Sequence, residues 1–326
     1  MLRSWRKAQM SKPTPSRKRG ARAFPSSGRT PKAVASPSVP ALISPRWLVT
    51  NIGLMILGAV ICAWLTLCLL FWQGSWQLLY RPTSAVTRTP ATAGLPFDVI
   101  QFADTPAGVP QLQGWWIPSG VPSRFTALYF HGERGNLGDA VGDLAQFQAA
   151  GLDVFAFDYR GYGQSVFKHP SESRMHEDAE AAIIYLTDTR HIAASSIVLV
   201  GRGLGANLAL EMAAAHPQFA GVVLESPLEN PLGAIFNDPR ALIVPASALV
   251  RDRWDTSASA SNLLIPSLWF YWPPAGANAA QEHQPLAYQT TKSRKSLVWL
   301  TGSPGADRDF QAALSRWLDD LTRPSR

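Results

Sequence analysis

The sequence predicts an α/β domain, built on a mostly parallel sheet with helices on both faces, that follows one membrane-spanning helix. Three observations predict this arrangement. Apolar strand-like runs alternate with helical patterns from about residue 96 onward. Glycine-rich turns follow several of these runs, and an uncharged stretch of 26 residues precedes them all. Uniformly apolar strands that alternate with helices are typical of a parallel sheet buried on both faces.

Residues 1–46 form a basic tail. They hold eleven Lys and Arg and no Asp or Glu, whereas the other 280 residues carry 19 basic and 23 acidic side chains, a net charge of −4. A basic cluster at residues 17–19 raises the question of nucleic-acid binding. However, Pro, Ser and Ala interleave the charges, and the tail has no set of aromatic residues for base stacking. We therefore expect a disordered cytoplasmic tail that binds no nucleic acid.

Residues 47–72 are expected to be a permanent transmembrane helix. A bilayer core requires about 20 apolar residues, and this run is too long for a cleaved signal peptide. The positive charges before it, with only Arg81 shortly after it, predict a type II single-pass membrane protein whose tail is cytoplasmic and whose domain is extracytoplasmic. We expect the bacterial inner membrane, with the domain in the periplasm. Cys62 and Cys68 both lie in the span, so the soluble domain has no cysteine for a disulfide or a thiol nucleophile.

The rest of the chain reads as a linker followed by alternating elements. Residues 73–95 are rich in Pro, Thr and Ala and are expected to be the linker. Two strands separated by a DTPAGVP turn should pair as a hairpin. The predicted elements that follow this linker are strands at 97–102, 113–117, 125–130, 152–157, 197–200, 221–225 and 296–301, a further strand that begins at 266 and runs into the loop 273–280, and helices at 138–150 and 176–187.

Residues 196–215 form the stretch around which the rest is organised. An apolar β-branched run ends in the turn GRGLG (201–205), and a helical pattern begins at once. A strand, a tight turn and a helix of this kind form the nucleophile elbow G-x-S-x-G, in which a strained backbone presents a serine. Here the serine position is Gly203. Glycine adopts the unusual backbone angles without steric cost, but it has no side chain that can attack a carbonyl.

Together with HGERGN (131–136) and DYRGYGQS (158–165), the elbow resembles the α/β-hydrolase superfamily. The likeness is to the membrane-anchored branch with HGxxGN, DYRGYGxS and GxSxG motifs, which is serine aminopeptidase-like or esterase-like. It covers about residues 77–321. The resemblance implies an α/β-hydrolase fold for residues 96–322, with a lid inserted at about 228–264. It also implies a Ser, Asp and His triad in that order along the chain.

All three triad positions depart from that pattern. The nucleophile is replaced by Gly203. The loop in which the resemblance places the acid, PPAGANAA (273–280), has no carboxylate, and the next one is Glu282. The loop expected to carry the base, at 302–307, has no histidine, and none occurs after His283. Triad members act as a unit, so we expect no catalytic residue, and restoring a serine alone should not restore an enzyme.

The remaining pocket residues are expected to be vestigial: His131, Gly132, Glu133, Arg134, Arg202 and Leu204. A carboxylate at Glu133 opposes a developing oxyanion unless Arg134 or Arg202 pairs with it. We expect a Glu133–Arg202 ion pair that fills the former pocket. His131 is expected to shape its turn, and Ser226, a candidate substitute nucleophile, is expected to close a strand.

The expected function is therefore non-catalytic. We expect the protein to bind a small acyl or apolar ligand, or to dock a protein partner, at the membrane, with no cofactor and no metal. One alternative is an active esterase or peptidase that uses unrecognised residues. The other is a dinucleotide-binding protein, because Gly201, Gly203 and Ala206 match the relaxed pattern G-x-G-x-x-A and Glu225 follows 24 residues on. That pattern normally opens a sheet, whereas several strands precede it here.

Overall fold

The computed structural model describes residues 44–272, 284–300 and 308–323. The loops expected to carry the catalytic acid and base, at 273–280 and 302–307, lie outside these ranges. The chain divides into two compact units, Met1–Ile56 and Leu57–Arg326, and the division falls within the first helix, α1 (Pro45–Gly74).

Helix α1 contains the predicted membrane span of residues 47–72. Among the described residues it is the one helix long and apolar enough to cross a membrane, with a mean hydropathy of 2.6 over its best 18-residue window. Thirty residues at 1.5 Å each give a length of about 45 Å. Most of its large apolar side chains are exposed, as expected of a helix that faces lipid.

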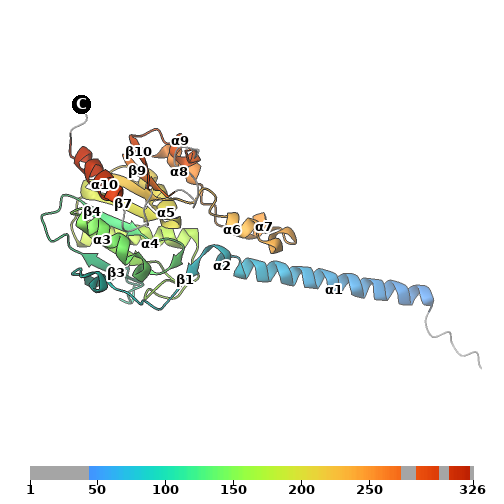
Figure 1. Ribbon diagram of the computed structural model, residues 1–326. Helices are drawn as coiled ribbons and strands as arrows, with labels where there is room; N and C mark the ends of the chain where they lie inside the picture. The colour runs from blue at the N-terminus through green and yellow to red at the C-terminus, as the bar shows by residue number, and fades with distance from the viewer. Residues whose placement is uncertain (1–43, 273–283, 301–307, 324–326) are drawn as a thin grey trace, which may run out of the picture. The chain divides into compact units, whose positions relative to one another are not determined.

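An eight-stranded sheet forms the centre of the second unit (Figure 1). Its order is β10-β9-β8-β7-β4-β6-β3-β2, and only the pairings β2–β3 and β3–β6 are antiparallel among its described strands. The mostly parallel sheet and the predicted hairpin are thus confirmed. The strand bounds are β2 Asp98–Phe102, β3 Leu112–Ile117, β4 Thr126–Phe130, β6 Asp153–Asp158, β7 Ile197–Arg202, β8 Gly221–Glu225, β9 Ser267–Tyr271 and β10 Lys295–Trp299.

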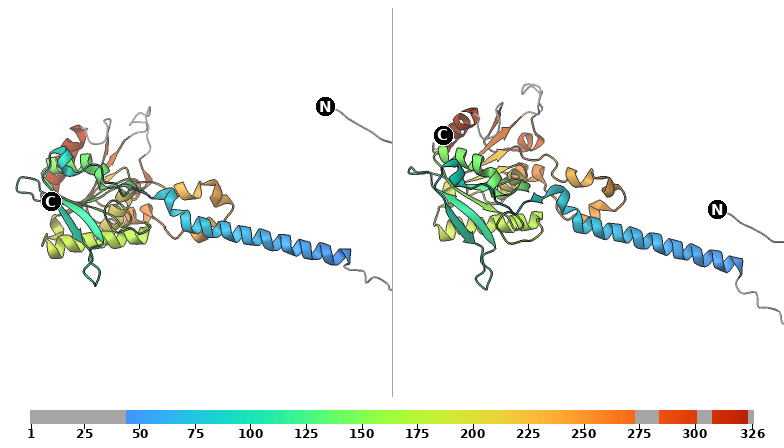
Figure 2. Two further views of the ribbon diagram at one scale, coloured as in Figure 1. Left: turned by 90° about the horizontal axis from the view of Figure 1, so that it is seen from below. Right: turned by 60° about the horizontal axis from the view of Figure 1, so that its bottom comes forward.

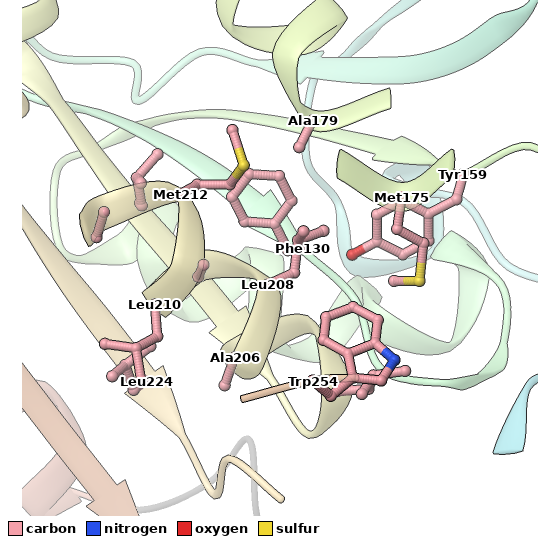
Figure 3. Close-up of a cluster of buried hydrophobic side chains, with 14 of the residues drawn as sticks. Phe130, Tyr159, Met175, Ala179, Ala206, Leu208, Leu210, Met212, Leu224 and Trp254 are labelled. Carbon is pink, nitrogen blue, oxygen red and sulfur yellow. The ribbon is translucent and has the colours of Figure 1, made fainter. Parts of the chain in front are cut away.

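Helices cover both faces of the sheet, and each face has its own apolar core. One core includes residues of α3 (Val141–Ala149) and α10 (Arg308–Leu321). The other includes residues of α4 (Glu172–Ile184), α5 (Leu204–Ala215) and α8 (Thr256–Asn262). Figure 3 shows how α4 and α5 bring their side chains together with those of β4 and β8 in this second core. The remaining helices are α2 Trp76–Leu79, α6 Gly233–Phe236, α7 Ala246–Leu249 and α9 Leu286–Thr290.

The segment expected to be a linker, residues 73–95, contains structure of its own. It holds α2 and a short strand, β1 (Arg81–Pro82), which pairs with β5 (Arg134–Gly135) in a separate two-stranded sheet. Tyr80 is buried between them, and its hydroxyl accepts a hydrogen bond from Trp254 Nε1 at 3.0 Å. The packed unit therefore begins before residue 96, and β1 contacts the loop that follows β4.

Candidate functional site

The turn between β7 and α5 has the geometry of a nucleophile elbow. Gly203, between the strand and the helix, has φ +56° and ψ −125°, a conformation that favours glycine. Its two neighbouring glycines are required by close packing. A Cβ atom on Gly205 would lie 2.2 Å from the Phe130 carbonyl oxygen, and one on Gly201 would lie 2.1 Å from the Gly205 carbonyl oxygen. The glycines of this turn thus allow α5 to pack against β4 and β7.

The carboxylate of Glu133 lies above this elbow. A Cβ atom on Gly203 would lie 3.0 Å from Glu133 Oε2. The same oxygen accepts a hydrogen bond from the backbone N–H of Leu204 at 3.3 Å. In α/β-hydrolases the N–H after the nucleophile helps to bind the oxyanion. Here an internal carboxylate accepts that hydrogen bond at the N-terminus of α5, where the helix dipole favours a negative charge.

The expected Glu133–Arg202 ion pair is wrong. Arg202 Nη1 donates instead to Asp143 Oδ1 and Oδ2, at 2.8 and 2.6 Å. Glu133 Oε1 pairs with Arg134 Nε at 3.4 Å. The reason is the alternation of side chains along β7. Arg202 is on the same side of the strand as Val198 and Val200, which face the core formed with α3 and α10, and its guanidinium therefore reaches Asp143 of α3.

A largely buried polar cluster surrounds Asp143. Tyr129 donates its hydroxyl to Asp143 Oδ2 at 3.0 Å. Glu225 of β8 lies opposite Arg202 of β7 in the sheet. Glu225 is 2% exposed, and its Oε1 has no hydrogen-bond partner among the described residues. Burial above all, and then the charge of Asp143, raise the pKa of Glu225 well above its ordinary value, although Arg202 opposes them. Glu225 therefore retains its proton in the folded protein at pH values where it would ionise in water.

A Glu225→Gln variant tests this protonation. A carboxyl whose pKa is raised on folding binds its proton more tightly in the folded state, so stability falls as the pH rises from about 4.5 toward the folded pKa. The loss reaches about 1.4 kcal/mol per pH unit. Glutamine has no such proton, so we expect the stability of Glu225→Gln relative to the wild type to increase with pH. Urea unfolding between pH 5 and pH 8 measures this difference, and parallel profiles would show that Glu225 is ionised when folded.

The second motif, DYRGYG, fixes the loop that carries Glu133. Tyr159 donates its hydroxyl to the carbonyl of His131 at 3.1 Å, and Tyr162 donates to the carbonyl of Glu133 at 2.9 Å. His131 is itself buried, and its Nε2 lies 3.4 Å from Asp158 Oδ1. These contacts agree with the structural role expected of His131, and they hold the backbone from which the Glu133 side chain extends.

The predicted pocket residues surround a cavity of about 520 Å³. Five of the six line it, namely His131, Gly132, Glu133, Arg134 and Arg202, and so does Gly203. The sixth, Leu204, is fully buried and contributes its backbone N–H. The structure therefore brings together the residues that the two loop motifs predicted.

Other lining residues were missed or given a different role. Asp143 and Trp272 line the same cavity, and neither is among the six predicted pocket residues. Asp143 could have been found, because it shares the buried face of α3 with Phe147, four residues on, and a charge on such a face indicates a buried partner. Ser226 also lines the cavity, at the end of β8, with φ +45°. Its N–H donates to the Phe270 carbonyl at 2.8 Å, which links it to the neighbouring strand β9.

Comparison with known proteins places this site in context. Residues 122–266 match the family model described as serine aminopeptidase, S33. The α/β-hydrolase domain-containing protein 17C of Xenopus tropicalis is 33% identical over 119 residues, which are 36% of this chain and 38% of that protein. Protein bem46 of Schizosaccharomyces pombe is 33% identical over 106 residues, 32% of this chain and 35% of that protein. The chain thus spans little more than a third of the length of these relatives.

The fold extends further than the sequence similarity. An esterase of Pyrococcus furiosus superposes with a TM-score of 0.56 over 75% of this chain and 98% of its own, at 17% identity. At that identity the likeness concerns the fold alone. The strand order and the glycine turn after β7 agree with it. The second unit of this chain is therefore a domain of the α/β-hydrolase fold, related over part of its length to α/β-hydrolase domain proteins.

Proposed function

We propose that this protein is a membrane-anchored α/β-hydrolase-fold protein without a working Ser-Asp-His triad, and that it binds a ligand or a partner instead of cleaving one. The observation that supports this most strongly is the elbow itself. Gly203 stands at the nucleophile position, and Glu133 Oε2 lies 3.0 Å from where its Cβ would be, while accepting the N–H of Leu204. Arg134 pairs with the other Glu133 oxygen at 3.4 Å, but the Arg134 side chain is 65% exposed, so solvent screening weakens this pair. The remaining negative charge opposes the one that develops on the carbonyl oxygen during acyl transfer.

The cavity chemistry narrows the class of ligand. Its lining includes the charged side chains of Glu133, Arg134, Asp143 and Arg202, with Trp272 at one side. A wholly apolar ligand would remove solvent from these charged groups and offer them no hydrogen bond in return, which is costly. The lining therefore favours a small acyl-bearing ligand with a polar head, or a polar segment of a partner protein, over a wholly apolar molecule.

We propose that α1 anchors the chain with its tail, residues 1–46, in the cytoplasm and the domain on the opposite side, in a bacterial inner membrane. The apolar length of α1 and the distribution of basic residues support this topology. Under this proposal the domain and its cavity remain near the membrane surface.

Two alternatives remain open to experiment. Ser226 lines the same cavity and has a positive φ. If the protein is an active hydrolase, Ser226 is the candidate for the substitute nucleophile. Dinucleotide binding at Gly201, Gly203 and Ala206 has less support. The N-terminus of α5, where a phosphate would bind, already receives the carboxylate of Glu133.

Ester turnover by the purified full-length chain in detergent tests the proposal. We expect the wild type to hydrolyse p-nitrophenyl acetate and p-nitrophenyl butyrate no faster than Ser226→Ala does, and both at the rate of the buffer, because the elbow offers no nucleophile. Turnover by the wild type that Ser226→Ala abolishes would establish the hydrolase alternative. Turnover that survives Ser226→Ala would also contradict the proposal and would point to another residue.

A further inference from the structure

Residues 233–250, within the lid region, extend alongside the domain-proximal part of α1. They carry α6, a 3₁₀ turn at Pro239–Leu242, and α7. Trp64 of α1 donates its indole N–H to the carbonyl of Ile243 at 3.0 Å. Figures 1 and 2 show α6 and α7 beside this end of α1 in each view. Both segments belong to the same compact unit.

The contact uses one face of α1. Cys68 and Phe71 follow Trp64 at positions i+4 and i+7, which lie on one side of a helix. These two are 9% and 7% exposed, whereas Leu70, on another face, is 59% exposed. Cys68 and Leu69 also line a groove with Ala248 and Leu249 of α7. One stripe of α1 thus packs against the protein, and the other faces remain open.

The position of the contact along α1 indicates its depth in a membrane. The predicted span ends at Trp72, and Trp64 comes eight residues earlier. Eight residues correspond to about 12 Å of helix. Because a hydrocarbon core is about 30 Å thick, a segment beside Trp64 would lie well inside one leaflet.

The surface of the segment at this level is apolar. Leu242 is 87% exposed and Ile243 is 60% exposed, at the end of the 3₁₀ turn. The nearby charges neutralise one another, because Arg240 donates from Nε and Nη2 to the two carboxylate oxygens of Asp238, at 2.7 and 2.9 Å. A paired charge costs less in a medium of low dielectric constant than a single one, and the arginine stem allows its head to reach the headgroups.

Backbone polar groups at such a depth require partners inside the protein. The N–H of Ala241 donates to the carbonyl of Asp238 at 2.9 Å, and that of Ile243 donates to the carbonyl of Arg240 at 3.2 Å. The carbonyl of Ile243 accepts the Trp64 indole N–H. This last bond satisfies two groups that would both be costly if left unpaired in hydrocarbon.

From these observations we propose that residues 239–245 are embedded in the leaflet next to the domain, with Leu242 and Ile243 among the acyl chains. The partner of this surface is bilayer lipid. The inference rests on the proposed anchoring by α1, and it adds a second membrane contact made by the domain itself. The domain is then held at a fixed height and orientation at the bilayer, rather than tethered at one point.

Fluorescence quenching of single-cysteine variants in phospholipid vesicles tests this. The Cys68→Ala variant retains Cys62, an exposed position in the span, as the anchor reference. In a Cys62→Ala, Cys68→Ala background, Leu242→Cys and Ile243→Cys report on the proposed embedded segment, residues 239–245. Val109→Cys, which is 54% exposed in the loop between β2 and β3, is the aqueous reference. Each cysteine is labelled with an NBD fluorophore, and quenching by doxyl-labelled lipid is compared with quenching by iodide.

We expect the labels at 242 and 243 to behave like that at Cys62, with strong quenching by doxyl lipid and protection from iodide, and the label at 109 to show the reverse. If Cys62 is quenched by lipid but positions 242 and 243 behave like 109, the inference is overturned and the anchor stands. Protection of the labels at 242 and 243 from both quenchers would also overturn it, because protein would then cover residues 239–245. Iodide quenching of Cys62 itself would remove the proposed anchor, and the inference with it.

Discussion

Gly205→Ala should destabilise the domain by about 3–5 kcal/mol, a large effect for a single methyl group. The added Cβ atom would lie 2.2 Å from the Phe130 carbonyl oxygen and 2.3 Å from that of His131. Both are backbone atoms at the end of β4, which pairs with β7 in the sheet. Relief therefore requires α5 to move away from the sheet, at the cost of the packing beneath it.

Gly142→Ala is the matched control for this substitution. Gly142 lies in α3, and a Cβ atom there would meet no atom within 4 Å. Alanine is the better helix former, so we expect a gain of up to about 1 kcal/mol. Urea unfolding of the full-length chain in detergent, followed by circular dichroism, compares the two midpoints. Similar midpoints for both variants would contradict the packing assigned to the elbow.

Arg202→Met is expected to cost about 2–3 kcal/mol of stability. The Asp143 side chain is 8% exposed, and its carboxylate has two described hydrogen-bond partners, Arg202 and Tyr129. The substitution leaves it with Tyr129 alone. Removal of one member of a buried ion pair typically costs 3–5 kcal/mol. We expect less because the Arg202 side chain is 37% exposed, so solvent screens part of the interaction.

Arg323→Met supplies the control for that variant, because Arg323 pairs with Asp320 where both side chains are exposed, at 75% and 53%. Its effect should stay within about 0.5 kcal/mol. The double variant Arg202→Met, Asp143→Leu should recover part of the loss, because no unpaired charge then remains buried. Equal losses for Arg202→Met and Arg323→Met, measured by urea unfolding, would show that the Arg202–Asp143 pair contributes little.

The fold could be predicted because its signals are local. Apolar runs and helical spacing indicate strands and helices directly, and the alternation of uniformly apolar strands with helices implies a mostly parallel sheet. The sequence analysis places the start of α4 at residue 176, four residues too late, because the helix begins before the regularly spaced apolar residues that indicate it. Ser171 accepts a hydrogen bond from the N–H of Arg174 there and fixes that start. The pairing of β1 with β5 was missed because two residues carry no periodicity.

The sequence indicated most of the residues that line the cavity, but not which charged side chains pair with one another. The motifs correctly indicated which loops meet at the elbow, because the carboxyl ends of parallel strands meet at one edge of a sheet. The meeting of two motifs at one sheet edge does not show on which face of its strand a side chain lies. For this reason the sequence analysis gave Arg202 the wrong partner. The alternation Val198, Val200, Arg202 contained the answer, since it directs Arg202 toward α3. The position of Glu133 above Gly203 depends on tertiary contacts from Tyr162, which no local pattern shows.

Covalent labelling by a fluorophosphonate probe, read by mass spectrometry of the intact chain and its peptides, tests most directly whether a nucleophile exists at this site. We predict no adduct on the folded wild type, at Ser226 or any other serine, above the level seen with the heat-denatured chain. An adduct at one serine of the folded protein, lost on its replacement by alanine and prevented by prior unfolding, would show an activated nucleophile and would contradict a non-catalytic role for this domain.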